Sequence, residues 1–200
     1  MRSTDEIRRD FVEALDEEAD ARLSALAFRR RRSKDDFVRR PRESVQRLVF
    51  RPNYKPRFHK GSEIYLYPLV WVEIPAIGAK ALEITGGDSW ALANAPGLIL
   101  NEPIDWSRGD GQRGFWHATG KLQMRTCIVE AVSFVERRIL PRLDDLQTIQ
   151  DFIRQCESRG VEKFAKGPVS VHIAAAYLLL NNRNAARQIL EGKHKPRENS

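Results

Sequence analysis

Cysteine is scarce in this chain, which has only Cys127 and Cys156 among its 200 residues. Both lie in stretches with helical spacing of apolar residues, so we expect two buried free thiols rather than a disulfide framework. Free thiols are typical of a reducing compartment. A chain of this length buries enough apolar surface to fold without a disulfide or a metal ion.

Long apolar runs are absent as well. The nearly uncharged stretch over residues 91–101 is far shorter than the roughly 20 residues that a membrane-spanning helix needs. The opening MRSTDEIRRD has no apolar segment of the kind that a secretory signal requires. We therefore expect a cytoplasmic protein with no membrane partner.

Signatures of catalysis and metal binding are also missing. The histidines His59, His117, His172 and His194 stand far apart and form no short metal motif. Neither cysteine has a base beside it in the sequence, and the glycine-bearing stretch 101–114 lacks the order and the lysine of a phosphate loop. We therefore predict no catalytic residue, no metal site and no cofactor. An enzyme, if the chain is one, would have its site in the 101–117 loop, formed by Asp105, Arg108, Asp110, Arg113 and His117.

Positive charge, in contrast, is concentrated in one place. The net charge is +7, and 13 of the 34 lysines and arginines fall between Arg29 and Lys60, against three acidic residues, so that segment carries +10. Elsewhere 24 acidic residues outnumber 21 basic ones. A localised basic surface attracts anionic partners, because the local field sets the rate of encounter. The sequence thus indicates where a binding surface should lie.

An acidic amphipathic helix is predicted just before this basic segment. Ser3 and Glu6 have the spacing of a capping box, and apolar residues recur at helical intervals over residues 4–26. The net charge from Arg2 to Ala27 is −4. Such a helix is able to neutralise part of the positive charge that follows it.

The basic segment itself has the alternation of β-strands. Residues 28–39 are predicted to form a hairpin, and residues 44–51 and 63–74 to form strands, with a loop over 52–62. If the N-terminal helix covers the side of Leu48 and Leu66, the opposite face presents Arg47, Arg51, Tyr65, Tyr67 and Trp71.

Two interpretations of these residues remain open. Arginines between exposed aromatic rings are typical of a stacking surface for single-stranded nucleic acid. Alternatively, the arginine stems pack over the rings, or the arginines pair with the acidic helix, and serve only the fold. Because neighbouring strand residues face opposite ways, the arginines from Arg29 to Arg32 cannot all line one surface. The candidate binding residues are Arg30, Arg32, Arg47, Arg51, Tyr65, Tyr67 and Trp71.

The remainder of the chain is predicted to be mainly helical. Residues 76–120 have a weak pattern and are expected to be mostly loop with one or two short strands. Helices are expected from Lys121 to Pro141, which should end the first, then over 143–158, 168–180 and 184–191, the last two as a hairpin. The predicted fold is α+β: an antiparallel sheet of three to five strands, packed by an N-terminal helix and C-terminal helices. The predicted organisation is an α+β domain over 1–160, the hairpin over 161–192 packed on it, and a disordered tail over 193–200.

The order of these parts resembles a known family. The chain has an amphipathic helix ending LSALAF, then basic residues, a short hairpin to Phe37, a strand with Gln46 and a later helix closing in ILPRLDDL. Over about residues 5–155 this is similar to the bacterial domain-of-unknown-function family number 4304, whose members typically have glycine where this chain has Ala27. The resemblance implies an α+β fold and assigns no functional residues.

These observations favour a bacterial binding protein without enzymatic activity, which contacts an acidic protein partner through the basic and aromatic sheet surface. A nucleic-acid-binding protein that uses the same surface is the alternative. An enzyme with a site in the 101–117 loop is the third possibility.

Overall fold

A computed structural model of the chain describes residues 2–31, 35–58, 60–87, 97–108, 116–159 and 168–192. The fold is α+β, as the sequence predicts. Its sheet has six strands in the described part of the chain, with the order β1-β2-β3-β4-β5 and β6 paired with β4, one strand more than the upper expectation. The strands are β1 (Arg29–Arg31), β2 (Asp36–Arg39), β3 (Val45–Tyr54), β4 (Ile64–Glu73), β5 (Leu98–Pro103) and β6 (Trp116–Ala118).

The chain divides into two compact units, and three of the boundaries between them fall inside β3, β4 and β5. Unit 1 comprises Met1–Arg39, Gln46–Trp71 and Asn101–Leu143. Unit 2 comprises Arg40–Val45, Val72–Leu100 and Asp144–Ser200. The predicted basic and aromatic surface therefore belongs to unit 1, and the predicted hairpin belongs to unit 2.

The N-terminal helix of unit 1 begins with the predicted capping box. Ser3 Oγ accepts a hydrogen bond from the Glu6 amide at 3.2 Å, and the Glu6 carboxylate accepts one from the Ser3 amide at 2.7 Å. The helix is interrupted at Ala19, so the predicted single element becomes α1 (Thr4–Glu18) and α2 (Asp20–Ala25). Its fully buried residues include Ile7, Phe11 and Leu15, which form the apolar stripe against the sheet.

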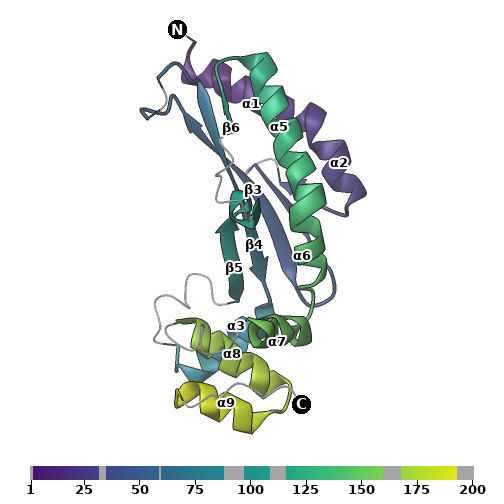
Figure 1. The fold of residues 1–200 in the computed structure, drawn as a ribbon, viewed down its shortest axis with the longest axis vertical. Coiled ribbons are helices and arrows are strands. Elements are labelled where there is room, and N and C mark those ends of the chain that lie inside the picture. Colours follow the sequence, from purple (N-terminus) through teal and green to yellow (C-terminus); the bar gives the residue numbers. More distant parts are fainter. Residues whose placement is uncertain are drawn as a thin grey trace. The chain divides into compact units, whose positions relative to one another are not determined.

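The long helix of unit 1 does not end where the sequence predicts. α5 (Lys121–Phe134) continues through a π-helical turn, η3 (Val135–Ile139), into α6 (Leu140–Asp144). The Leu140 amide donates to the carbonyl of Val135, five residues back, and Pro141 then falls in the first turn of α6. Proline is tolerated in a first turn because its missing N–H would have no partner there. The π-helical turn η3 thus allows the helix to continue beyond Pro141. Figure 1 shows α5 beside α1.

Unit 2 contains a helix that the weak pattern of residues 76–120 does not reveal. α3 (Pro75–Ile84) has proline at its first position and buries Ile77, Gly78 and Ala81. The expectation of mostly loop is wrong there, because α3 is apolar on several sides and lacks the clear stripe of a surface helix. Gly78 also weakens the helical signal of this segment, because glycine has a low helix propensity.

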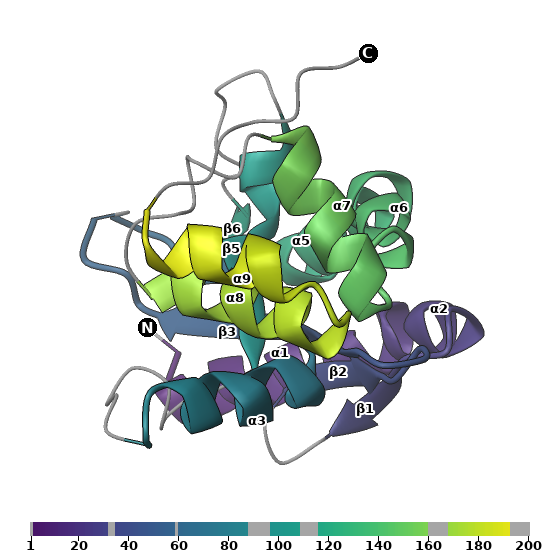
Figure 2. The ribbon, with the colours of Figure 1, turned by 90° about the horizontal axis from the view of Figure 1, so that it is seen from below.

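The C-terminal hairpin is confirmed. It consists of α8 (Pro168–Leu179) and α9 (Arg183–Leu190), and α8 packs between α9 and α3 (Figure 2). Asn182 caps α9, since its side-chain oxygen accepts from the Ala185 amide at 3.1 Å. α7 (Ile149–Ser158) also packs on α8. Gly160, the start of the predicted hairpin segment (161–167) and the tail (193–200) lie outside the described residues.

Candidate binding surface on the sheet of unit 1

The register of the first three strands sorts their side chains into two faces. Phe37 pairs with both Arg30 and Leu48, so these three side chains share a face. Phe37 and Leu48 are buried, and α1 lies over that face, with Asp16 reaching Arg30. Arg47 pairs with Val38 and therefore lies on the opposite face, as predicted. By the same alternation Arg31 and Arg51 share that opposite face.

Arg30 belongs to the helix-covered face and is separated from the other candidate residues. Its side chain is only 4% exposed and forms an ion pair with Asp16 of α1. Its guanidinium carbon lies 5.7 Å from the centroid of the Phe37 ring. This is the role in the fold that the second interpretation of the sequence offers. Arg32, another candidate, lies outside the described residues.

The opposite face carries what we call the arginine–aromatic face, made of Arg47, Arg51, Tyr65, Tyr67 and Trp71 with Arg31 at its edge. Arg51 lies over the indole ring of Trp71, with its guanidinium carbon 5.7 Å from the ring centroid. Arg51 is exposed and has no ion pair with any described residue. Trp71 Nε1 is shielded from solvent and has no acceptor among the described residues.

A shallow hollow of about 290 Å³ lies beside this pair. Arg31, Arg47, Arg51 and Trp71 contribute to its lining, together with Asp36. Arg31 donates to the Asp36 carboxylate at 2.7 Å, so one of these arginines is already neutralised by an acid on the same face. Asp35 lines the hollow as well, and Arg51 is an arginine of this lining that has no ion pair with a described residue.

Aromatic rings continue from this hollow along β4. Tyr65 and Tyr67 have ring centroids 6.3 Å apart with an interplanar angle of 32°. Phe58, from the loop after β3, meets the Tyr65 ring edge-on at 5.3 Å. Phe58 is 62% exposed and Tyr67 38% exposed, so two of the three rings offer a substantial surface to solvent. His117 of β6 pairs with Tyr65 in the register and is also exposed.

Phe58 and His117 are the members of this row that sequence reasoning missed. Phe58 had a weak signal, because it is a lone aromatic residue in a loop with Arg57 and Lys60. No sequence signal placed His117 beside Tyr65, since the pairing of β6 with β4 joins residues about fifty positions apart in the chain.

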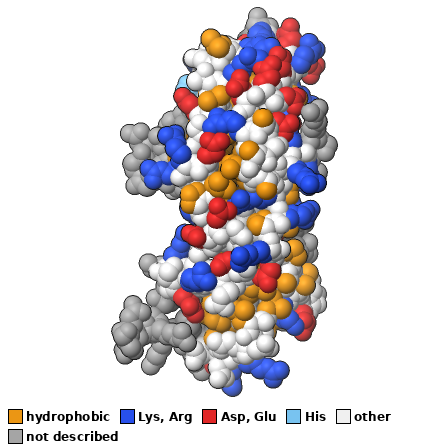
Figure 3. Space-filling model, turned by 90° about the vertical axis from the view of Figure 1, so that its right-hand side faces the viewer, with side chains coloured by type: hydrophobic (Ala, Val, Ile, Leu, Met, Phe, Trp, Pro, Cys, Tyr) orange, Lys and Arg blue, Asp and Glu red, His pale blue; other side chains and the backbone are white. Residues whose placement is uncertain are grey.

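Three acidic residues of α1 form ion pairs with basic residues of α5. Glu13 accepts from Lys121 of α5 at 2.8 Å, and Glu17 forms an ion pair with Arg125 of α5. Asp10 forms an ion pair with Arg2. Figure 3 views unit 1 from the side of these helices and shows acidic and basic side chains interspersed. Arg30 of β1 is paired with Asp16 of this helix, whereas Arg51 has no ion pair with a described residue.

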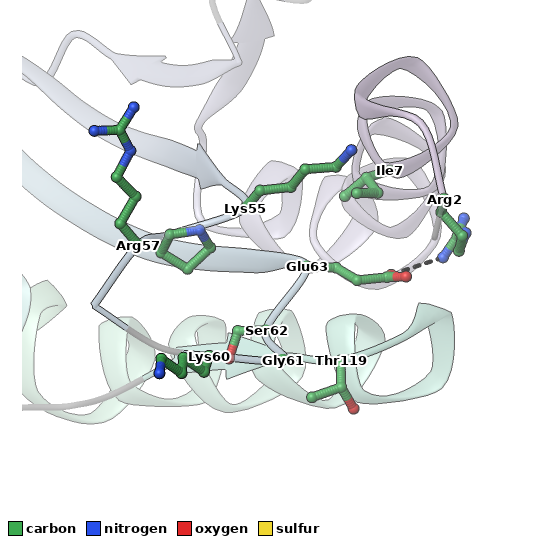
Figure 4. A pocket seen from close by; sticks show the side chains of 10 residues that line it. Arg2, Ile7, Lys55, Arg57, Lys60, Gly61, Ser62, Glu63 and Thr119 are labelled. Atoms are coloured by element: carbon green, nitrogen blue, oxygen red, sulfur yellow. Dashed lines mark hydrogen bonds and ion pairs between the residues drawn. The ribbon is translucent and has the colours of Figure 1, made fainter.

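A second hollow, of about 390 Å³, lies at the loop between β3 and β4. Lys55, Arg57 and Lys60 line it, and none of them has an ion pair with a described residue. Figure 4 shows their side chains extending in three different directions, whereas Glu63 turns toward Arg2. The three cations thus spread positive charge over the loop and do not converge on one point as in a phosphate clamp.

Of the predicted enzymatic cluster in the 101–117 loop, the structure describes the side chains of Asp105 and His117. Asp105 is buried in η2 (Ile104–Arg108), which packs against η3, and His117 is exposed on β6. The side chain of Arg108 is not described, and Asp110 and Arg113 lie outside the described residues. The described residues contain no group of three or more histidine, cysteine or acidic side chains able to hold a metal ion.

The two cysteines are buried and free, as predicted. Burial, with a smaller contribution from Glu130, raises the pKa of Cys127 to about 11. Burial raises the pKa of Cys156 to about 12. Both thiols are therefore protonated near neutral pH and are poor nucleophiles. Among the helices that the structure describes, none has the length and hydrophobicity to cross a bilayer.

Comparison with known proteins adds no relative. No protein-family model matches the chain, and no curated protein or solved structure matches it.

Proposed function

We propose that this chain is a non-enzymatic binding protein that contacts an acidic partner through the arginine–aromatic face of unit 1. The observation that carries the proposal is Arg51, which is exposed, lies over Trp71 and has no described ion pair. An arginine that serves only the fold is expected to pair with an acid, as the buried Arg30 does with Asp16. Membership of the 4304 family and a cytoplasmic location, which two free thiols favour, stay predictions.

The experiment uses two polyanions without aromatic groups, poly-glutamate and inorganic polyphosphate, at about 50 and 200 mM salt. The test variant is Arg47→Glu with Arg51→Glu. Its matched control is Arg8→Glu with Arg9→Glu, which makes the same change in net charge at two exposed positions of α1. Arg8 and Arg9 have no ion pair with a described residue.

We expect the parent protein to bind at least one polyanion at the lower salt concentration and to bind it more weakly at the higher one. The Arg47 and Arg51 variant should lose about tenfold or more in affinity, because a contact with each anionic group is replaced by repulsion. The α1 variant should lose much less. Equal losses in the two variants would mean that only net charge matters and would contradict the proposal. If neither probe nor any nucleic acid binds at low salt, the proposal is also contradicted.

A further inference from the structure

We infer that the acidic partner is a single-stranded nucleic acid, whose bases stack on Phe58, Tyr65 and Tyr67 while its phosphates contact the surrounding cations. The inference rests on the proposed function and specifies the partner of the same face. Two observations carry it: a contiguous row of rings, and cations at both ends of that row that have no ion pair with a described residue.

The rings form one connected series. Phe58 touches Tyr65, and Tyr65 touches Tyr67, with centroid separations of 5.3 and 6.3 Å. Phe58 and Tyr67 expose 62% and 38% of their surface. Aromatic rings are ordinarily buried, because removing them from water favours folding, and those that are exposed are usually scattered singly over the surface. A base offers a flat apolar surface to such rings, and every base has one, so this mode of binding tolerates many sequences.

The cations lie at the ends of the row. At the β4 end of the row, Arg51 lies over Trp71. At the other end, the loop that carries Phe58 also carries Lys55, Arg57 and Lys60. These four side chains have no ion pair with a described residue. Because the loop cations spread apart (Figure 4), they match a series of phosphates along a strand better than a single phosphate group. A positively charged track with stacking rings is the usual arrangement for single strands.

The same geometry disfavours two other partners. In a duplex the faces of the bases are already stacked on one another, so the rings would find only edges and backbone. An acidic protein would satisfy the arginines with carboxylates, but it would have no general reason to meet a row of rings. On the arginine–aromatic face, the described residues form no site that would recognise a ribose 2′-hydroxyl. We therefore expect RNA and DNA strands to bind with similar affinity.

The experiment measures the anisotropy of labelled strands of about 15 nucleotides, within the usual site size of a single-strand module. The probes are an RNA strand, a DNA strand, a duplex of equal length and a strand of the same backbone without bases. The ring variants are Phe58→Ala and Tyr67→Ala, and Tyr67→Phe keeps the ring while removing the hydroxyl. Leu122→Ala is the control, since Leu122 is 80% exposed on α5 and lies on the side of the helices.

We expect the strands with bases to bind about 5- to 150-fold more tightly than the base-free backbone, the range that one stacked base provides. Each ring-to-alanine variant should lose at least about fivefold for the strands with bases. It should leave the affinity for polyphosphate unchanged. Tyr67→Phe and Leu122→Ala should behave like the parent protein. Phe58 lies in a loop and is mostly exposed, so its removal is not expected to impair folding.

Failure of this inference differs from failure of the proposed function. If the base-free backbone or poly-glutamate binds as tightly as the strands with bases, and the ring variants bind normally, stacking is overturned and an acidic protein becomes the partner. Loss of that binding with Arg47 and Arg51 reversed would still support the proposed function. Tighter binding of the duplex would overturn the inference as well. If no polyanion and no nucleic acid binds, both are overturned.

Discussion

Gln46 accepts a hydrogen bond from Arg39 inside unit 1, with a distance of 2.6 Å between Arg39 Nε and Gln46 Oε1. The amide nitrogen of Gln46 in turn donates to the carbonyl of Leu143 at 2.7 Å. Gln46 is completely buried, and the guanidinium of Arg39 lies 4.9 Å from the centroid of the Phe28 ring. One glutamine side chain thus links a strand, a buried charge and the end of a helix.

Replacement of this glutamine by leucine should lower the free energy of unfolding by about 2 to 3 kcal/mol, because a buried charged donor and a buried carbonyl each lose a partner. Urea denaturation of the Gln46→Leu variant measures this change. Gln150→Leu is the control, since Gln150 is exposed on α7 and its replacement should stay within about 0.5 kcal/mol. A loss as small as the control's would show that the network contributes little.

Ala27 ends α2 in a conformation that favours glycine, with φ of 66°. The Phe28 amide reaches back to the Leu23 carbonyl at 3.0 Å, which is the pattern of a helix that ends with a left-handed residue. Ala27→Gly should therefore raise the free energy of unfolding by about 0.5 to 1 kcal/mol. The control Ala21→Gly, at an exposed position within α2, should lower it by a similar amount. If both changes destabilise the protein, strain at Ala27 is not significant.

Thr148 caps α7 and also shapes the response of unit 2 to acid. Its hydroxyl accepts from the Asp151 amide at 3.1 Å, and Asp151 accepts from the Thr148 amide at 3.0 Å. Although burial alone raises the pKa of Asp151, hydrogen bonds from Thr148 and Gln147 lower it below its ordinary value of 3.8. Thr148→Ala should cost about 1 kcal/mol at neutral pH.

The sign of the pH dependence follows from this lowered pKa. The unfolded chain takes up a proton at Asp151 near pH 3.8, whereas the folded chain does so only at lower pH. The contribution of the ionised carboxylate is therefore complete above that value and is lost as the pH falls through the folded pKa. Denaturation between pH 5 and pH 2 should be less steep in an Asp151→Asn variant; an unchanged slope would contradict the assignment.

The thiols should react only after unfolding. Because burial raises their pKa to about 11 and 12, Cys127 and Cys156 have little thiolate at pH 8. Iodoacetamide should modify neither in the native protein within the time that modifies both in guanidinium, as mass spectrometry of the intact chain would show. Rapid native modification of either thiol would contradict this.

Alkaline conditions should reveal the same burial as a loss of stability. The unfolded thiols ionise near pH 9, whereas the folded ones keep their protons to about pH 11, so the free energy of unfolding falls as the pH rises through this interval. A variant with both cysteines replaced by alanine should lose less stability over that interval. The difference between the two curves isolates the thiols from other alkaline groups.

The sequence predicted the local features of unit 1 well. Alternation placed Arg47 and Arg51 opposite Leu48, and the spacing of Ser3 and Glu6 marked the start of α1, because both features depend on neighbours in the chain. The pairing of His117 with Tyr65 and the partner of Arg30 depend on contacts between distant segments, and no local pattern encodes them. In unit 2, α3 escaped prediction because its surroundings, rather than an amphipathic stripe, determine its structure.

The pairing of the α1 acids with basic residues of α5 has a consequence for the approach of a charged molecule. Because Glu13 and Glu17 are paired with basic residues of α5 while Arg51 has no ion pair with a described residue, we expect the positive potential of unit 1 to be stronger on the strand side. A polyanion that diffuses toward it would experience a torque before any contact forms, and the side that meets the polyanion first would be the strand side. The ion pairs of the helices thereby orient the encounter without touching the partner.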